Sequence, residues 1–144
     1  MFSSPAAADH ANISSTLTLE REACLEWLTQ PTILFDQGRM RRTMNVEVAS
    51  DASLFAVDAV LLGRTAMEEV VRTGFVSDAR RIRRDGRLIY ADTFRLTDEL
   101  ETSVMIPTVL AGHLAMASLI YIAPVGAKLL NHPGAAKVAA RGTP

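Results

Sequence analysis

Two aspartates are the residues of this sequence that are best suited to chemistry. Asp58 interrupts the apolar run Leu54–Leu62, and Asp92 lies in a similar context between Tyr90 and Phe94. A carboxylate in such a segment costs on the order of several kcal/mol to desolvate unless it is paired, hydrogen-bonded, hydrated or bound to a cation. Two carboxylates that face one cavity could perform acid–base catalysis or pass a divalent ion, and the sequence leaves both open.

The compensation of the Asp58 charge has two interpretations. In the first, the partner is Arg64 or another arginine, and the ion pair is only structural. In the second, the carboxylate lines a water-filled channel or binds a metal ion transiently. The two interpretations predict different surroundings for the same side chain.

A run of arginines is the strongest local charge feature of the chain. Its members are Arg80, Arg81, Arg83, Arg84 and Arg87. Such a run is typical of a basic patch for nucleic acid or an acidic partner, or of a solvated hairpin whose charges protect a sheet edge. Few aromatic side chains lie nearby for base stacking, and the formal net charge of the chain is −1. Both features argue against a nucleic-acid partner.

Other common site signatures do not occur in the sequence. It contains no phosphate-binding loop, dinucleotide fingerprint, nucleophile elbow or paired-histidine zinc helix. The three histidines lie far apart in the sequence, and the single cysteine, Cys24, can form neither an internal disulfide nor a thiolate zinc cluster. A lone cysteine suits a reducing compartment, so we predict a cytoplasmic location.

An uncharged stretch between Ser103 and Ala127 is long enough to cross a bilayer. However, Pro107, Gly112 and Pro124 interrupt it, and acidic rather than basic residues precede it. We therefore expect buried strands or a core helix in this stretch, and we expect no membrane partner.

Most of the chain up to residue 96 has the two-residue hydrophobic period of β-strands. Met44, Val46 and Val48 share one face of such a segment, and Arg42 breaks that face, which suggests that this end emerges from the core. The run Leu54–Leu62 is typical of a strand covered on both faces. The dipeptide at residues 85–86, Asp-Gly, predicts the turn of a β-hairpin between strands 75–84 and 88–96.

The 144 residues are enough for one domain. We predict a mainly β fold with many short strands in a β-solenoid or sandwich-like arrangement, and a little helix towards the C-terminus in the alanine-rich segment 128–140. Residues 1–15 carry no secretory signal and are predicted to form a flexible tail, residues 16–130 the domain, and residues 131–144 a weakly ordered tail.

Three segments resemble motifs of one protein family. Segment 24–33, CLEWLTQPTI, resembles the LEWLPQ signature of the UreD-type urease accessory proteins. Segment 62–69, LGRTAMEE, is similar to their LGRPAxGE segment, and segment 82–88, IRRDGRL, is similar to their IRRDGRPL hairpin. The motifs occur in the family's order and with matching gaps. The chain is much shorter than a typical member, so it resembles a partial or truncated one.

The resemblance implies a non-enzymatic nickel-insertion chaperone with a mainly β fold. Members of the family dock on apo-urease and recruit the other accessory proteins, including the GTPase that delivers nickel, and nickel passes through them transiently. The family's acidic interior positions correspond here to Asp58 and to Asp92, where members commonly carry Glu. These two residues are therefore the expected nickel path. The expected partner-binding residues are Arg64, Glu69, Arg83 and Arg84.

Two alternatives remain open at the level of the sequence. A β-fold hydrolase would use Asp58 and Asp92 as a carboxylate pair, and it requires the two carboxyl groups to converge in a substrate pocket. A small nucleic-acid-binding β domain would use the run of arginines, and it requires salt-dependent binding of RNA or DNA.

Overall fold

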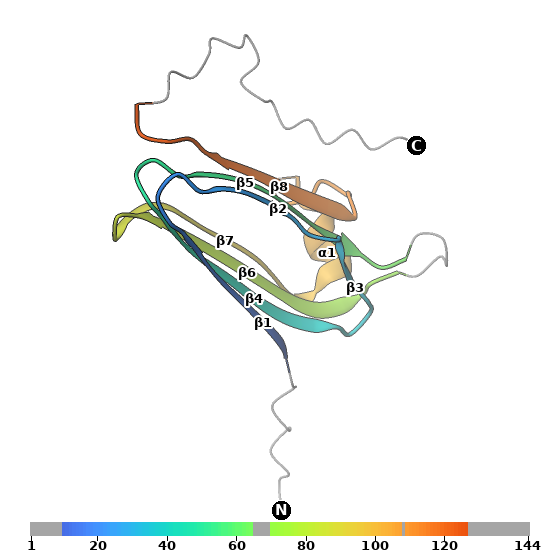
Figure 1. Ribbon diagram of the computed structural model, residues 1–144. Coiled ribbons are helices and arrows are strands. Elements are labelled where there is room, and N and C mark those ends of the chain that lie inside the picture. The colour runs from blue at the N-terminus through green and yellow to red at the C-terminus, as the bar shows by residue number, and fades with distance from the viewer. Residues whose placement is uncertain (1–9, 65–69, 108, 127–144) are drawn as a thin grey trace, which may run out of the picture.

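The computed structural model describes residues 10–64, 70–107 and 109–126. Strands dominate these residues, which confirms the predicted mainly β class (Figure 1). In chain order the described elements are β1 (Ala11–Leu19), β2 (Cys24–Leu28), β3 (Thr32–Leu34), β4 (Arg39–Val48), β5 (Ser53–Leu62), β6 (Thr73–Arg84), β7 (Arg87–Glu99), α1 (Leu100–Met105) and β8 (Ala115–Ile122).

The strands form two mixed sheets that lie as two layers in Figure 1. The first sheet has the order β1-β4-β6-β7, in which β1, β4 and β6 are parallel and β7 is antiparallel to β6. In the second sheet β5 pairs in parallel with β2 and β3 and antiparallel with β8. Strands β2 and β3 follow one another along the same edge of β5, because β8 occupies the other edge. The chain changes sheet between β1 and β2, β3 and β4, β4 and β5, β5 and β6, and, through α1, between β7 and β8.

Strand β4 has the predicted alternation. Met40, Arg42, Met44, Val46 and Val48 are buried on one face, while the residues that alternate with them point out of the first sheet. Alternation of this kind places one face of a strand on the core and leaves the other face to solvent.

The sequence predicts that β5 is covered on both faces, and this prediction is wrong for the outward face of the strand. Leu54 and Leu62 are buried between the sheets, but Phe55, Val57 and Leu61 point outward and are only half-buried. A strand covered on both faces belongs to a sheet with a packed layer on each side. The outward side chains of β5 instead remain partly open to solvent.

The predicted hairpin is confirmed. Strands β6 and β7 pair antiparallel across the turn, in which Asp85 and Gly86 have φ values of 48° and 78°. Two consecutive positive φ values are the requirement of a type I′ turn, and glycine meets it without steric cost. Strand β1 begins at Ala11, within the segment 1–15 that the sequence predicts to be a flexible tail.

The described helix is not at the C-terminus, contrary to the prediction. It is α1, which precedes β8, whereas segment 128–140 lies outside the described residues. No helix in the described part of the chain is long and apolar enough to cross a membrane. The uncharged stretch contains the end of α1 and the whole of β8, which pairs with β5.

The space between the sheets contains two separate apolar clusters. One lies towards the β6–β7 turn and includes Val48, Leu54 and Ile82. The other lies towards α1 and includes Val76 and Leu100. Between the two clusters, inward positions of β4 and β6 in the first sheet and of β5 in the second sheet carry charged side chains. These side chains form the candidate site.

Candidate functional site

Four ionisable side chains meet between the sheets, and we call them the charged layer. They are Arg42 of β4, Asp58 of β5, and Asp78 and Arg80 of β6. On their strands, Arg42 and Asp58 each lie between inward residues of the two apolar clusters, and the consecutive inward pair Asp78 and Arg80 lies between Val76 and Ile82. Arg42 and Asp78 are also direct partners in the β4–β6 register. The strand alternation therefore places all four side chains in one layer.

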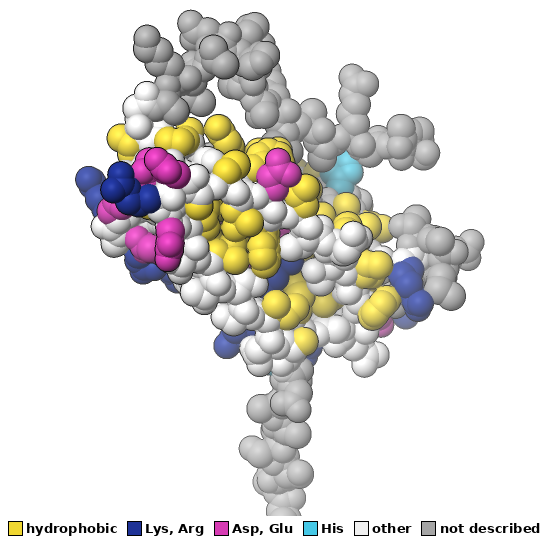
Figure 2. Space-filling view, viewed as in Figure 1, with side chains coloured by type: hydrophobic (Ala, Val, Ile, Leu, Met, Phe, Trp, Pro, Cys, Tyr) yellow, Lys and Arg dark blue, Asp and Glu magenta, His cyan; other side chains and the backbone are white. Residues whose placement is uncertain are grey.

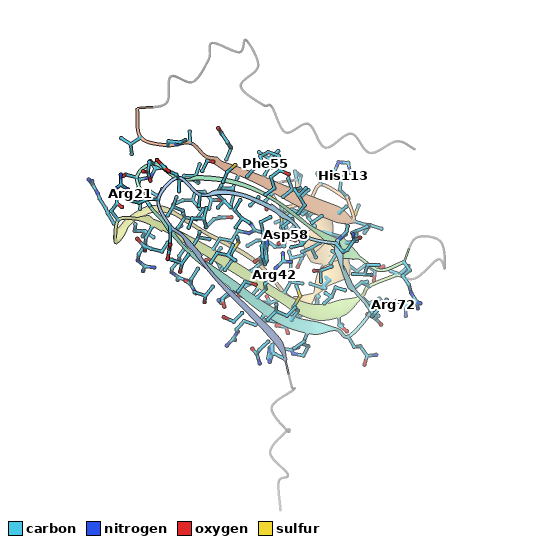
Figure 3. All side chains as sticks on the ribbon, viewed as in Figure 1. Arg21, Arg42, Phe55, Asp58, Arg72 and His113 are labelled. Atoms are coloured by element: carbon cyan, nitrogen blue, oxygen red, sulfur yellow. The ribbon has the colours of Figure 1, made fainter. Side chains whose placement is uncertain are left out.

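Arg42 joins the two sheets through its guanidinium group. Its Nη2 donates to Asp78 Oδ2 at 2.7 Å and lies 2.8 Å from Asp58 Oδ2, and its Nη1 donates to Asp58 Oδ1 at 3.0 Å. Figure 3 shows Arg42 and Asp58 pointing toward each other from opposite layers. Two contacts to the Asp58 carboxylate form the fork geometry that is strongest for arginine.

Arg80 is the second cation of the layer. It donates through Nη2 to Asp78 Oδ2, and the same nitrogen lies 3.8 Å from Asp58 Oδ2. Two aspartates and two arginines have a formal charge of zero, so the layer compensates itself within the described residues. For Asp58, this agrees with the first of the two interpretations left open by the sequence, in which an arginine compensates the charge. The main partner is Arg42 and not Arg64.

Burial makes this pairing necessary. Asp78 is 1% exposed and Arg80 is 3% exposed, and the Asp58 side chain is 13% exposed. Burial disfavours the charged form of Arg42, but hydrogen bonds and charge from Asp78 and Asp58 outweigh it and raise the pKa of Arg42 above its ordinary value. The guanidinium is therefore a fixed positive charge at any physiological pH.

The layer is not fully satisfied. Asp78 Oδ1 and Arg42 Nε are buried and have no hydrogen-bond partner in the described part of the chain. An unpaired buried polar atom costs about 1–3 kcal/mol. The layer thus holds unused hydrogen-bonding capacity at its centre.

A pocket of about 230 Å³ lies next to the charged layer. Asp58, Asp78, Thr29 and Thr32 line its polar part, and Trp27 contributes to its apolar part. Thr29 Oγ1 donates to Asp58 Oδ1 at 3.1 Å, and Thr32 Oγ1 accepts from the Arg42 guanidinium at 3.2 Å. The two carboxylates of the layer and Arg42 therefore line one pocket, whose lining is otherwise largely apolar.

Asp92 lies on the other side of Arg80. It faces Arg80 in the β6–β7 register, with Asp92 Oδ2 3.9 Å from Arg80 Nη1, and its side chain is 49% exposed. It does not line the pocket that contains Asp58. The convergence that the hydrolase alternative requires is absent from this pocket, because Asp58 and Asp92 share a cation rather than a common cavity.

The position of Arg42 corrects the sequence interpretation. We expected this residue to mark the end of β4 that emerges from the core, but Arg42 is buried, at 8% exposure. It is tolerated there because Asp58 and Asp78 pair with it. A signal was present, since Arg42 and Asp58 each interrupt an apolar face, and opposite charges that do so are candidates for a buried pair.

The run of arginines is divided by strand geometry. Arg80 belongs to the charged layer, Arg81 is exposed on the outer face, and Arg84 is half-buried. The Arg84 guanidinium donates to the backbone carbonyl of Ala123 at 2.5 Å. Sequence reasoning missed Asp78 and Arg80 as site residues because Arg80 was assigned to a surface patch.

The three expected partner-binding residues that the structure describes lie at two separate ends of the sheets. Arg83 and Arg84 lie at the β6–β7 turn, and Arg64 follows the opposite end of β5, with its guanidinium carbon 4.8 Å from the Phe35 ring centroid. Glu69 lies outside the described residues. Within the described ranges, no group of three or more His, Cys, Asp or Glu side chains could hold a metal ion.

Comparison with known proteins identifies the relatives of the chain. A family model described as UreD urease accessory protein matches residues 1–141. A protein of Rhizobium leguminosarum bv. viciae named urease accessory protein UreD is 41% identical over 126 residues, which are 88% of this chain and 46% of that protein. A protein of the same name from Granulibacter bethesdensis is 46% identical over 112 residues, which are 78% of this chain and 47% of the relative.

The chain spans about half the length of the curated relatives that it matches. The family match itself covers nearly all of the chain, and it agrees with the three motifs found in the sequence. The chain belongs to the UreD family of urease accessory proteins.

Proposed function

We propose that this chain acts in urease maturation as a non-catalytic accessory protein. It docks on apo-urease subunits together with the other accessory proteins, including the nickel-delivering GTPase, and nickel passes through it as cargo. Membership of the UreD family supports the role in urease maturation. The partners and the passage of nickel extend beyond what that membership establishes.

The charged layer is the observation that carries the proposal of nickel passage. It places the carboxylates of Asp58 and Asp78 in the lining of a pocket, and it reaches the half-exposed Asp92 on the far side of Arg80. Carboxylate oxygens are hard, exchangeable ligands that suit an ion which must be released again. We propose that nickel enters from the pocket, contacts Asp58 and leaves past Asp92.

Arg42 and Arg80 limit when nickel can pass the charged layer. Arg42 occupies both Asp58 oxygens, so a cation can bind there only when the guanidinium group moves away. The charge balance favours the closed arrangement, because a metal ion next to two arginines is repelled. In this proposal nickel is held weakly and briefly, and docking of the partners supplies the free energy that opens the pair.

The test combines complex formation with nickel transfer. The tagged chain is incubated with apo-urease subunits and the accessory proteins, with and without nickel, and both the captured complex and the nickel content of urease are measured. Asp58→Asn keeps the size of the side chain but removes its charge, and Arg42 keeps Asp78 as a partner. We expect Asp58→Asn to retain the complex and to slow nickel transfer.

Asp85→Asn is the matched control, because Asp85 is exposed in the β6–β7 turn and has a positive φ that asparagine adopts readily. It should match the wild type in both measurements. Failure of the wild-type chain to capture urease or an accessory protein would overturn the docking proposal. Equal transfer rates for Asp58→Asn and the wild type would overturn the path through Asp58 but leave docking intact.

A further inference from the structure

The outer face of the first sheet is polar and basic, and it is not used by the proposed nickel path. The strand registers place the outward side chains of β4, β6 and β7 side by side. The arginines of this face are Arg39, Arg41, Arg81, Arg83 and Arg95. Two acidic side chains lie near these arginines: Glu47, whose carboxylate accepts a hydrogen bond from the Gly86 N–H, and Asp98, which is close to Arg39.

The charge of this face contrasts with that of the whole chain. The chain has a formal net charge of −1, so the arginine excess on this face is a local concentration and not a general property. In Figure 3 side chains with blue nitrogen ends extend from the outer side of the lower layer, which contains β4 and β6. A locally positive field of this kind attracts negative partners and directs their approach.

The arginines at the β4 start of this face are arranged around one aromatic ring. The guanidinium carbons of Arg39 and Arg41 lie 5.3 Å and 5.9 Å from the centroid of Phe75, and the His10 ring packs edge-on against Phe75 at 4.7 Å. Cation–π contacts restrict long side chains that would otherwise be mobile. A guanidinium that is already ordered loses less entropy when it binds a ligand.

Arg41 and Arg95 lie at a defined spacing on the outer face of the first sheet. Both lie opposite Ser77 in the central strand β6, so they are two strands apart on one face. Neighbouring strands are about 4.8 Å apart, which separates the two backbones by about 10 Å. Both side chains are exposed, and Arg39 has a distant partner in Asp98 at 4.0 Å. The face therefore presents guanidinium groups that can pair with carboxylates from outside.

The chemistry of the face favours carboxylates over nucleic acid. Planar guanidinium groups bind carboxylates through paired hydrogen bonds. Single-stranded nucleic acid is usually held by exposed aromatic rings, but Phe75 is half-buried beneath arginines. Nucleic-acid-binding domains also commonly have an isoelectric point above about 9, and this chain has one of about 6.3.

We propose that the outer face of the first sheet is a docking surface for an acidic protein segment, with Arg41 and Arg95 as its principal contacts. The partner supplies aspartate or glutamate side chains at the spacing of alternate strands. Figure 2 shows one side of the molecule, where the middle of the visible surface is largely apolar or uncharged and charged side chains gather towards its left end.

The test measures binding of a labelled oligo-glutamate peptide to the full chain by fluorescence anisotropy at low and physiological salt. The variant Arg41→Glu/Arg95→Glu reverses the two principal charges. The matched control Arg21→Glu/Arg72→Glu makes the same net change at exposed arginines outside this face. Single-stranded RNA and duplex DNA serve as competing probes, and thermal unfolding establishes that both variants are folded.

We expect the Arg41/Arg95 variant to weaken peptide binding by at least about tenfold and the control by less than about threefold, with binding that weakens as salt rises. Equal weakening by the two variants would overturn the proposal, because net charge alone would then account for binding. The proposal would also be overturned if the wild-type chain failed to bind the peptide at low salt, or if RNA or DNA bound to Arg41 and Arg95 more tightly than the peptide.

Discussion

The space between the two sheets contains regions of opposite character. Towards the β6–β7 turn and towards α1 it is filled by apolar side chains, including Leu54 and Leu100, which are fully buried. Between them the charged layer replaces apolar packing with two ion-paired arginines and two aspartates. Strand alternation contributes to all three regions, because their strand residues occupy inward positions, and α1 adds Leu100 to the cluster at its end.

The two kinds of region contribute differently to stability. Burial of an apolar side chain stabilises the fold by about 1.5–3 kcal/mol. A buried ion pair recovers little more than the cost of its desolvation, and well-packed apolar replacements are often as stable or more stable. Stability alone therefore does not account for the charged layer, and this difference supports a functional role for it.

Breaking the layer at its most buried member should have the largest effect. Asp78→Ala removes the carboxylate that pairs with both arginines and leaves two buried positive charges with fewer partners. We expect a loss of about 3–5 kcal/mol in the free energy of unfolding, measured by urea denaturation. The half-exposed Asp92 is the control, and Asp92→Ala should cost less than about 1 kcal/mol. Similar losses for the two variants would contradict the distinction between a buried layer and its exposed edge.

A large-to-small change in an apolar cluster should have a comparable or slightly smaller effect. Leu54→Ala removes a fully buried side chain that packs between the sheets, and we expect a loss of about 2–5 kcal/mol by the same measurement. Leu119→Ala makes the same chemical change on the outer face of β8, where the side chain is 51% exposed. That variant should lose well under half as much, and equal losses would show that the cluster is not the core.

The elements of the fold were predicted more completely than the site. Local chemistry specifies the β6–β7 hairpin, because Asp85-Gly86 can adopt the two positive φ values by itself. It also specifies the buried face of β4, through the spacing of Met44, Val46 and Val48. These features depend on residues that are close in sequence, and so the sequence predicts them.

The site depends on contacts between distant residues. Arg42, Asp58 and Asp78 come from three strands and two sheets, and no local pattern specifies that they meet. The sequence analysis grouped Arg80 with the neighbouring arginines, although Arg80 shares the inward face of β6 with Asp78 and Ile82. Pairing a charge with its partner requires the strand register, which follows from the tertiary fold.

Replacing the whole layer tests whether it exists for stability. A variant with Arg42→Met, Asp58→Leu, Asp78→Leu and Arg80→Met exchanges every charge of the layer for an apolar side chain. We expect it to be at least as stable as the wild type, with a gain of up to about 1–4 kcal/mol in urea denaturation. It should not support nickel transfer. A loss of stability as large as that of Asp78→Ala would show that the charges themselves hold the sheets together.

The smallest effect concerns Asp36, a carboxylate outside the charged layer that accepts hydrogen bonds from backbone N–H groups. Asp36 Oδ1 accepts hydrogen bonds from the Arg72 N–H at 2.8 Å and the Thr73 N–H at 3.1 Å. The bonds from Thr73 and then Arg72 hold the pKa of Asp36 below its ordinary value of 3.8. Because the folded pKa is depressed, this stabilisation is present above pH 3.8 and is lost as the pH falls through the folded value.

Asp36→Asn removes the titration but keeps an oxygen that can accept from both N–H groups. Urea midpoints measured from neutral pH to below 3.8 should show a small advantage of the wild type that disappears at the acidic end. The wild type should be the more stable at neutral pH, because the ionised carboxylate is the stronger acceptor. A constant difference across the pH range would contradict the depressed pKa, since a group that titrates alike in the folded and unfolded chain contributes no pH dependence.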